Sequence, residues 1–233
     1  MYEKGDMLGG NLLLAAGLEI KADLRRYLGW LVGQTEKAPG VTVKRGTDAT
    51  PKNIRAEHAD ALIVAVGSDP IIPKIPGVEK AHVVWVGDVA VGKAKVGERV
   101  VIIGGGSTGG EAALQLAKDG KKVTIVDMQD FLTLAGDWPR GLSDMLERYG
   151  ARLMLEVKVE EITDKGAVVM DKAWNRHEVA ADTVILSLGF TARTETVDLF
   201  KDAAPDVYTV GDCVKPQTIK EAVHGGFNVA VEI

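Results

Sequence analysis

The stretch Val101-Ile102-Ile103-Gly104-Gly105-Gly106-Ser107-Thr108-Gly109 decides how this sequence folds. Three of its glycines, Gly104, Gly106 and Gly109, have G-x-G-x-x-G spacing. An apolar run over residues 99–103 predicts a strand before them, and a helix is predicted over residues 107–119. In this motif the first glycine permits a tight turn, the second lets the backbone approach a pyrophosphate, and the third lets helix and strand pack closely. We therefore expect a dinucleotide site here, with the helix N-terminus facing the phosphates.

Asp127 supports this prediction. It lies 18 residues after Gly109, at the end of a second apolar run over residues 122–126. An acid in this position accepts hydrogen bonds from a ribose 2′-OH. Asp130 follows closely and would repel a 2′-phosphate, so the sequence favours NAD(H) over NADP(H). The alternative for Asp127 is an acid that caps a turn.

Composition sets broad limits on function. The 233 residues fit one large or two small domains, and 46% apolar residues with 27 glycines suit an α/β protein. A net charge of −5 without a basic run argues against nucleic acid as the partner. Neither a signal peptide nor an apolar run of membrane-spanning length is visible, which favours a cytoplasmic setting. The single cysteine, Cys213, excludes an intramolecular disulfide or a C-x-x-C pair, and the histidines lack metal-ligand spacing.

Two similar apolar runs indicate duplicated architecture. Residues 59–67 read Ala-Asp-Ala-Leu-Ile-Val-Ala-Val-Gly, and residues 181–189 read Ala-Asp-Thr-Val-Ile-Leu-Ser-Leu-Gly. Each predicts a strand buried on both faces and ending at a glycine, over residues 61–66 and 183–188. Another short strand, over residues 207–210, is expected to return to the first unit and complete its sheet. We therefore expect an α/β protein of two interleaved, Rossmann-like, three-layer dinucleotide-binding domains.

Further elements follow from periodicity and turn residues. Apolar positions at helical spacing predict an amphipathic helix over residues 20–36. A short strand is expected over residues 41–44, and a helix over residues 139–149. Strands are predicted over residues 152–156, 158–162 and 167–171, the last two as a hairpin. A helix is expected from about residue 218.

The order of these motifs resembles the flavoprotein disulfide reductase superfamily over nearly the whole chain. The pattern is an acid with Gly-Gly, then A-x-G-x-x-P-x-x-P-x-I-P-G, then G-x-G-x-x-G-x-E, then V-Y-x-x-G-D. Within the superfamily the chain is most similar to the C-terminal module of NADH:flavin oxidoreductases related to 2,4-dienoyl-CoA reductase and trimethylamine dehydrogenase. Residues 87–89, residues 95–104 and the lack of C-x-x-C support this. The resemblance implies an FMN barrel and an iron–sulfur cluster upstream.

The resemblance also assigns cofactor contacts. Glu3 matches the acid that holds the adenosine ribose of FAD, and Asp212 matches the acid that meets its ribityl hydroxyls. Glu111 matches an acid that lies toward the nicotinamide. The complete set of candidate cofactor-binding residues is Gly104, Gly105, Gly106, Ser107, Thr108, Gly109, Glu111, Asp127 and Gly189, together with Glu3, Gly9, Gly10, Ala65, Gly67, Gly211 and Asp212. No residue is predicted to be catalytic or to bind a metal.

One departure from the family pattern concerns the FAD domain. Family members carry a strand and a G-x-G-x-x-G loop about thirty residues before the acid that matches Glu3. We therefore expect a fragment whose FAD domain, residues 1–95 with 196–233, is truncated at its N-terminus, beside an NAD domain over residues 96–195. FAD binding by the chain is then expected to be weak or absent, and exposed sheet edges could favour a homo-oligomer.

Alternatives remain for single residues and for the whole chain. Asp212 could be a turn acid, Glu3 could be disordered, and Glu111 could only favour the helix dipole. The implied activity is hydride transfer from NADH to FAD, and onward to an upstream FMN or iron–sulfur centre. The alternatives are a non-catalytic module that binds ADP, and a trimmed relative of small NADH oxidases or ferredoxin reductases.

Overall fold

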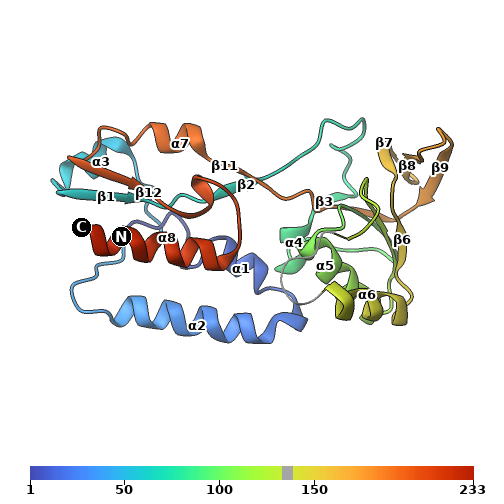
Figure 1. The fold of residues 1–233 in the computed structure, drawn as a ribbon, viewed down its shortest axis with the longest axis horizontal. Helices are drawn as coiled ribbons and strands as arrows, with labels where there is room; N and C mark the ends of the chain where they lie inside the picture. The colour runs from blue at the N-terminus through green and yellow to red at the C-terminus, as the bar shows by residue number, and fades with distance from the viewer. Residues whose placement is uncertain (133–138) are drawn as a thin grey trace. The chain divides into compact units, whose positions relative to one another are not determined.

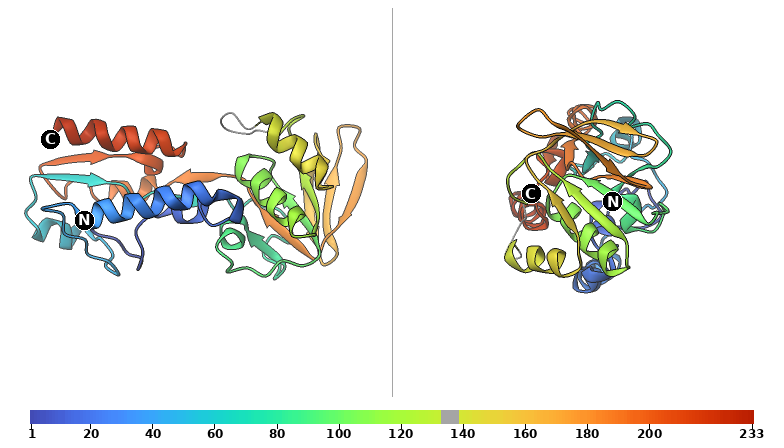
Figure 2. Two further views of the ribbon diagram at one scale, coloured as in Figure 1. Left: turned by 90° about the horizontal axis from the view of Figure 1, so that it is seen from below. Right: turned by 90° about the vertical axis from the view of Figure 1, so that its right-hand side faces the viewer.

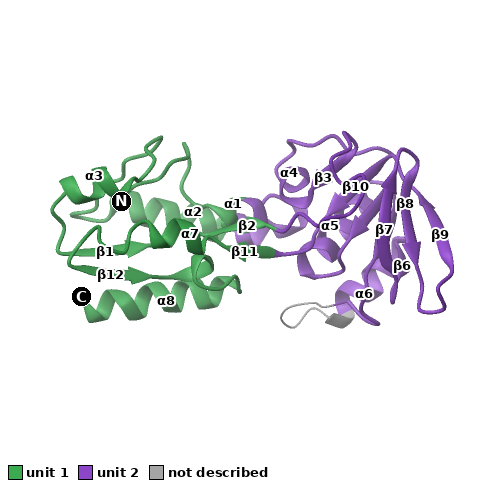
Figure 3. Cartoon of the chain, turned by 90° about the horizontal axis from the view of Figure 1, so that it is seen from above, with its two compact units in different colours: residues 1–13, 26–70, 190–233 green, residues 14–25, 71–189 purple. Residues whose placement is uncertain are grey.

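The computed structural model describes residues 1–132 and 139–233, with only the backbone described at residues 139 and 140. The chain divides into two compact units, which are coloured separately in Figure 3. Unit 1 comprises residues 1–13, 26–70 and 190–233, and unit 2 comprises residues 14–25 and 71–189. Each unit is built from separate segments of the chain, as interleaved domains require.

Unit 2 contains a five-stranded parallel sheet. Its strand order is β3-β10-β4-β5-β6, and each neighbouring pair is parallel. The strands are β3 (Val83–Trp85), β10 (Thr183–Leu186), β4 (Arg99–Ile103), β5 (Lys122–Val126) and β6 (Arg152–Met154). The non-sequential order brings β10 between β3 and β4, so residues 183–186 lie beside the strand that leads into the glycine stretch. The outer strands of this sheet, β3 and β6, are labelled in Figure 1.

Two further layers cover the faces of this sheet. Alternate residues of β4 point to opposite faces, as the pleat of a strand requires. Val100 and Ile102 pack in the core that includes α5 (Ser107–Lys118) and α6 (Pro139–Arg148), whereas Val101 and Ile103 pack against the opposite layer. That layer is an antiparallel sheet of β7 (Lys158–Thr163), β8 (Gly166–Met170) and β9 (Arg176–Ala180). The predicted three-layer α/β architecture is therefore present in unit 2.

Unit 1 has two short strand pairs. β1 (Ala61–Val64) pairs in parallel with β12 (Asp206–Thr209), and β2 (Ser68–Pro70) pairs antiparallel with β11 (Phe190–Ala192). The first pair confirms that the strand near residue 207 returns to the first unit.

The helical segments that complete the fold are mostly short. They are α1 (Asn11–Ala15), η1 (Glu19–Lys21), α2 (Ala22–Lys37), α3 (Pro51–Ala56), α4 (Val86–Ala90), α7 (Thr194–Asp198), η2 (Gly211–Cys213) and α8 (Ile219–Glu232). Helix α8 carries the C-terminus and is red in Figure 2. Among the described residues, no helix has the length and apolar character needed to cross a membrane.

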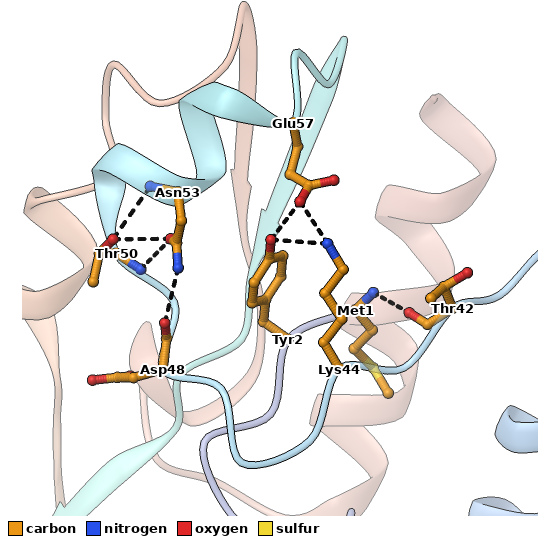
Figure 4. Close-up of polar contacts among 8 residues, drawn as sticks. All are labelled: Met1, Tyr2, Thr42, Lys44, Asp48, Thr50, Asn53 and Glu57. Carbon is orange, nitrogen blue, oxygen red and sulfur yellow. Dashed lines mark hydrogen bonds and ion pairs between the residues drawn. The ribbon is translucent and has the colours of Figure 1, made fainter.

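Polar contacts fix the N-terminal residues of unit 1 (Figure 4). The Tyr2 hydroxyl donates to Glu57 Oε1 over 2.5 Å, and Lys44 Nζ reaches the same oxygen over 2.6 Å. The hydrogen bond from Lys44 lowers the pKa of the Glu57 carboxyl, and the hydrogen bond to Glu57 raises the pKa of Lys44. The Met1 amino group donates to the Thr42 carbonyl oxygen over 2.6 Å.

Most elements predicted around the glycine stretch are confirmed. β4 and β5 have the predicted bounds, and α5 ends one residue early. The predicted helix over 20–36 is divided into η1 and α2. Its apolar stripe is the half-buried side of α2, although no residue of α2 is fully buried.

Two predictions about strands were wrong. Residues 41–44 form no strand, because their backbone pairing is limited to an isolated bridge between Tyr2 and Lys44. The run at 61–66 is not buried on both faces, since Ile63 keeps 41% of its surface exposed. Within the described residues β1 pairs with β12 alone, so its sheet lacks the neighbours that would cover it.

The boundaries between the predicted domains stay a prediction. Residues 71–95 fall in unit 2, whereas the sequence analysis placed them with the FAD domain. The reason is visible in the sheet, because β3 lies in this segment and pairs with β10 of the same unit.

Candidate functional site

The glycine stretch forms a tight turn between β4 and α5. Gly104 has φ +107°, and a Cβ at this position would overlap the carbonyl oxygen of Ser187. A Cβ at Gly109 would overlap the carbonyl oxygen of Gly104. The first and third glycines of the motif are therefore required by the close packing of the turn, the start of α5 and the end of β10.

The N-terminus of α5 lies directly after this turn. Gly106 is its N-cap in an extended conformation, and no side-chain cap is present among the described residues. Ser107 is half-buried and Thr108 is exposed. A helix N-terminus carries backbone N–H groups and the positive end of the helix dipole, and both attract anions. The turn therefore offers what a phosphate group requires.

Asp127 is joined to the same turn. Its Oδ2 accepts a hydrogen bond from the Gly105 amide over 2.5 Å, and its Oδ1 accepts one from the Gln129 amide over 2.9 Å. These contacts hold the carboxylate, which is partly exposed, beside the glycine turn. Each carboxylate oxygen has a second lone pair, so Asp127 can accept further hydrogen bonds from a ligand.

Glu111, in the second turn of α5, forms an ion pair with Lys21 of η1. A second contact joins the same segments, because Gln115 Oε1 accepts a hydrogen bond from the Ile20 amide over 3.2 Å. Residues 20 and 21 are therefore held against α5, the helix that follows the glycine turn. The carboxylate of Glu111 is therefore compensated by the Lys21 ammonium.

Asp212 is the centre of a polar cluster in unit 1. Its Oδ2 accepts hydrogen bonds from Ser68 Oγ over 3.2 Å and from Asn11 Nδ2 over 3.5 Å. Asn11 Nδ2 also donates to Ser68 Oγ over 3.0 Å, and Asp212 Oδ1 accepts from the Gln217 amide over 3.3 Å. We call Asn11, Ser68, Asp212 and the Gln217 amide the Asp212 cluster. It joins segments that are far apart in the sequence.

Arg193 fixes the turn that carries Ser68. Its Nη1 donates to the Val66 carbonyl oxygen over 2.7 Å. Its Nε and Nη2 donate to Asp69 Oδ1 over 2.9 and 2.6 Å. The hydrogen bond from Arg193 lowers the pKa of the Asp69 carboxyl, and the hydrogen bond to Asp69 raises the pKa of the guanidinium.

The remaining candidate residues occupy turns. Gly10, Gly67, Gly189 and Gly211 all have positive φ, as does Gly9, and Ala65 is exposed after β1. Gly10 and Gly67 directly precede Asn11 and Ser68, and Gly211 directly precedes Asp212, so these candidates meet around the Asp212 cluster. Gly189 ends the segment after β10 in unit 2. Glu3 lies apart from the cluster in its own turn, where its Oε1 accepts from the Gly5 amide over 2.7 Å.

Sequence reasoning missed Lys21, Asn11, Ser68 and Arg193. Asn11 and Ser68 each follow a candidate glycine, and that adjacency was the only available signal. Cys213 is buried, and its thiol lies 3.3 Å from the Val64 carbonyl oxygen, so it acts as a packing residue. Within the described part of the chain, no group of three or more metal-ligating side chains is present.

The strand, glycine turn, helix and acidic strand end together define a Rossmann-type dinucleotide-binding fold. A family model described as "Pyridine nucleotide-disulphide oxidoreductase" matches residues 19–226. The chain belongs to this family. The resemblance drawn from the motifs of the sequence is thereby confirmed.

Several relatives match the whole chain. It is 34% identical to an NADH oxidase from Thermoanaerobacter brockii, covering 100% of this chain and 37% of that protein. It is 32% identical to a cinnamate reductase from Clostridium sporogenes, covering 100% of this chain and 35% of that protein. A solved 2-naphthoyl-CoA reductase complex superimposes with a TM-score of 0.92 at 29% identity, covering 100% of this chain and 36% of that one. The chain thus spans little more than a third of these relatives.

Proposed function

We propose that this chain is a pyridine-nucleotide-dependent flavin oxidoreductase module. Unit 2 binds NAD(H) through the turn at 104–109, the N-terminus of α5 and Asp127. Unit 1 contributes contacts to FAD through the Asp212 cluster. The observation that carries the proposal is the Gly105–Asp127 hydrogen bond, because it holds a carboxylate beside the N-terminus of α5.

The residues of unit 2 fit NAD(H). The pyrophosphate requires a close backbone approach and N–H donors, and the α5 N-terminus supplies both. The ribose requires an acceptor, which Asp127 offers at the lone pairs that Gly105 and Gln129 leave unused. Asp127 and the exposed Asp130 would repel a 2′-phosphate, which favours NADH over NADPH.

The residues of unit 1 fit the sugar chain of a flavin. Asp212 is half-buried and already accepts from Ser68, Asn11 and Gln217. A carboxylate oriented in this way accepts hydrogen bonds from ribityl hydroxyls without further reorganisation. Three glycines with positive φ adjoin the cluster, and an added Cβ at Gly10 or Gly67 would meet no neighbouring atom, so room remains beside the backbone.

When both cofactors are bound, they supply hydride transfer from the nicotinamide to the flavin. The protein then contributes binding and orientation. Asp127 fixes the adenosine half of NAD(H), and α5 fixes its phosphates. The Lys21–Glu111 pair joins η1 to the second turn of α5, and we place it toward the nicotinamide end of the site. No side chain is assigned as a general acid or base.

The whole protein is proposed to pass electrons further. Its relatives are much longer than this chain and include an NADH oxidase and reductases of conjugated substrates. We propose an FMN and iron–sulfur domain upstream as the receiver. Stopped-flow reduction of the full-length protein by NADH should then bleach the flavin bands before the cluster signal changes. Flavin bands that do not respond to NADH would contradict this order.

Calorimetric titration of the chain with NADH tests the dinucleotide site directly. We expect saturable binding that Asp127→Ala weakens about tenfold or more, the effect of losing a charge-assisted hydrogen bond. NADPH should bind more weakly than NADH. Glu147→Ala is the matched control, because it removes an exposed acid of α6 in the same unit and should leave affinity unchanged. An Asp127→Ala affinity equal to the wild-type value would refute the assignment.

A further inference from the structure

The chain passes from unit 1 to unit 2 after β2 and returns before β11. These strands form a short antiparallel ribbon in which Ser68 lies opposite Ala192. Ser68 is one of the few buried polar residues, with 3% of its surface exposed. Its hydroxyl accepts a hydrogen bond from Asn11 and donates one to Asp212, so its single proton is used inside the Asp212 cluster.

Arg193 holds the turn on both sides of Ser68. One guanidinium nitrogen bonds the Val66 carbonyl oxygen before the Gly67–Ser68 step, and two others bond the Asp69 carboxylate after it. The guanidinium is planar and rigid, so it fixes the separation of its two acceptors in a way that a lysine ammonium does not. Three-quarters of the Arg193 side chain is shielded from solvent.

We propose that Arg193 is the positioning residue of the Asp212 cluster. It does not touch the proposed ligand. It fixes the turn over residues 66–69, so that Ser68 Oγ meets Asp212 and the carboxylate is oriented before the flavin binds. This inference rests on the proposed function for the ligand, but the positioning role itself concerns only residues of this chain.

Hydrogen exchange of backbone amides tests the positioning role of Arg193 separately from the assignment of a flavin ligand. The Gln217 amide donates to Asp212 Oδ1, so its exchange rate reports whether the carboxylate is in place. Arg193→Met should raise exchange at the amides of Gln217 and of residues 66–69 without changing unit 2. The control is Arg99→Met in unit 2. It removes the Arg99–Asp182 pair, in which the guanidinium likewise donates two hydrogen bonds to one carboxylate oxygen. It should leave exchange at Gln217 unchanged.

Flavin affinity supplies the second measurement. Using FAD fluorescence quenching in the full-length protein, we expect Arg193→Met to weaken FAD binding about tenfold, which is the effect of misplacing one charge-assisted hydrogen bond. If Arg193 acts through Ser68, then Arg193→Met combined with Ser68→Ala should bind FAD no more weakly than Ser68→Ala alone. Asp69→Asn, which keeps the Arg193–Val66 bond, should give a smaller effect and guards against misfolding of the arginine variant.

Each outcome decides one claim. Unchanged exchange at Gln217 in both Arg193→Met and Asp69→Asn overturns the positioning role. Additive losses of FAD affinity in the double variant also overturn it, because two independent contributions would add. If exchange responds but Arg193→Met leaves the FAD affinity of the full-length protein unchanged, the positioning role stands and the flavin assignment of unit 1 fails.

Discussion

At the scale of single residues, Gly109 and Gly33 predict opposite outcomes for the same substitution. A Cβ at Gly109 would overlap the Gly104 carbonyl oxygen, whereas a Cβ at Gly33, inside α2, would meet no atom within 4 Å. Gly109→Ala should destabilise the protein by about 2 kcal/mol through overpacking and should abolish NADH binding. Gly33→Ala should stabilise it by about 0.5–1 kcal/mol through helix propensity. Denaturant unfolding followed by circular dichroism measures both changes in the free energy of unfolding. Two changes of the same sign would contradict the packing argument.

The residues of the candidate site differ in how far the sequence could reveal them. Asp127 and the glycine turn follow from local spacing, since strand, turn and helix must be adjacent in the chain. Lys21 could not be found in this way, because its partner Glu111 is 90 residues away and on another element. Ser68 and Asp212 are separated by 144 residues. Only tertiary structure brings such pairs together.

At the scale of elements, the β8–β9 hairpin is held by one carboxylate. Asp171 accepts hydrogen bonds from the Ala173 and Asn175 amides over 2.9 Å, and its Oδ2 lies 2.8 Å from His177 Nε2. The hydrogen bond with His177, followed by those from Asn175, lowers the pKa of Asp171 to about 2. The hairpin carries Trp174 at its tip with φ +65° and 81% exposure.

This hairpin should loosen in acid. A carboxyl whose folded pKa is lowered stabilises the fold above its unfolded pKa, and that contribution is lost as pH falls through about 2. The indole N–H resonance of Trp174 should therefore shift between pH 4 and about 2, and Asp171→Asn should remove this transition. Asp182, whose pKa is also about 2, gives the comparison. Asp182→Asn should keep the Trp174 transition, and an identical transition in Asp171→Asn would refute the assignment.

Elements with local signals were predicted well, and elements with long-range pairing were not. β4, β5 and α5 are bounded by glycines and charged residues next to apolar runs, so their limits could be read. The ribbon of β2 and β11 could not, because its three-residue strands have no periodicity and pair across more than a hundred residues. β9 was missed for a different reason, because it pairs locally in a hairpin but its sequence shows no apolar alternation. Its sequence, Arg-His-Glu-Val-Ala, has one buried residue and depends on pairing with β8.

At the scale of the whole molecule, the repeat of an apolar run ending in glycine indicated interleaving. Both runs are strands, β1 and β10, and they lie in different units. The repeat did not reveal how differently the two strands are covered. β10 is buried throughout, whereas β1 has an exposed isoleucine, since coverage depends on neighbouring strands and layers that a repeat does not specify.

The apolar stripe of α8 predicts self-association of the chain. Four large side chains at i, i+4 spacing remain exposed along it: Ile219, Val223, Phe227 and Val231, with exposed fractions from 40% to 67%. No residue of α8 is buried. Contiguous apolar surface of this kind favours association, because burying it removes it from water.

We expect sedimentation velocity to show oligomers of the chain whose fraction increases with concentration. Phe227→Glu, which places a charge in the apolar stripe of α8, should reduce these oligomers strongly. Trp174→Ser removes a more exposed but isolated aromatic side chain from unit 2 and should leave association unchanged. A wild-type chain that stays monomeric at every concentration would show that the stripe does not pair with itself.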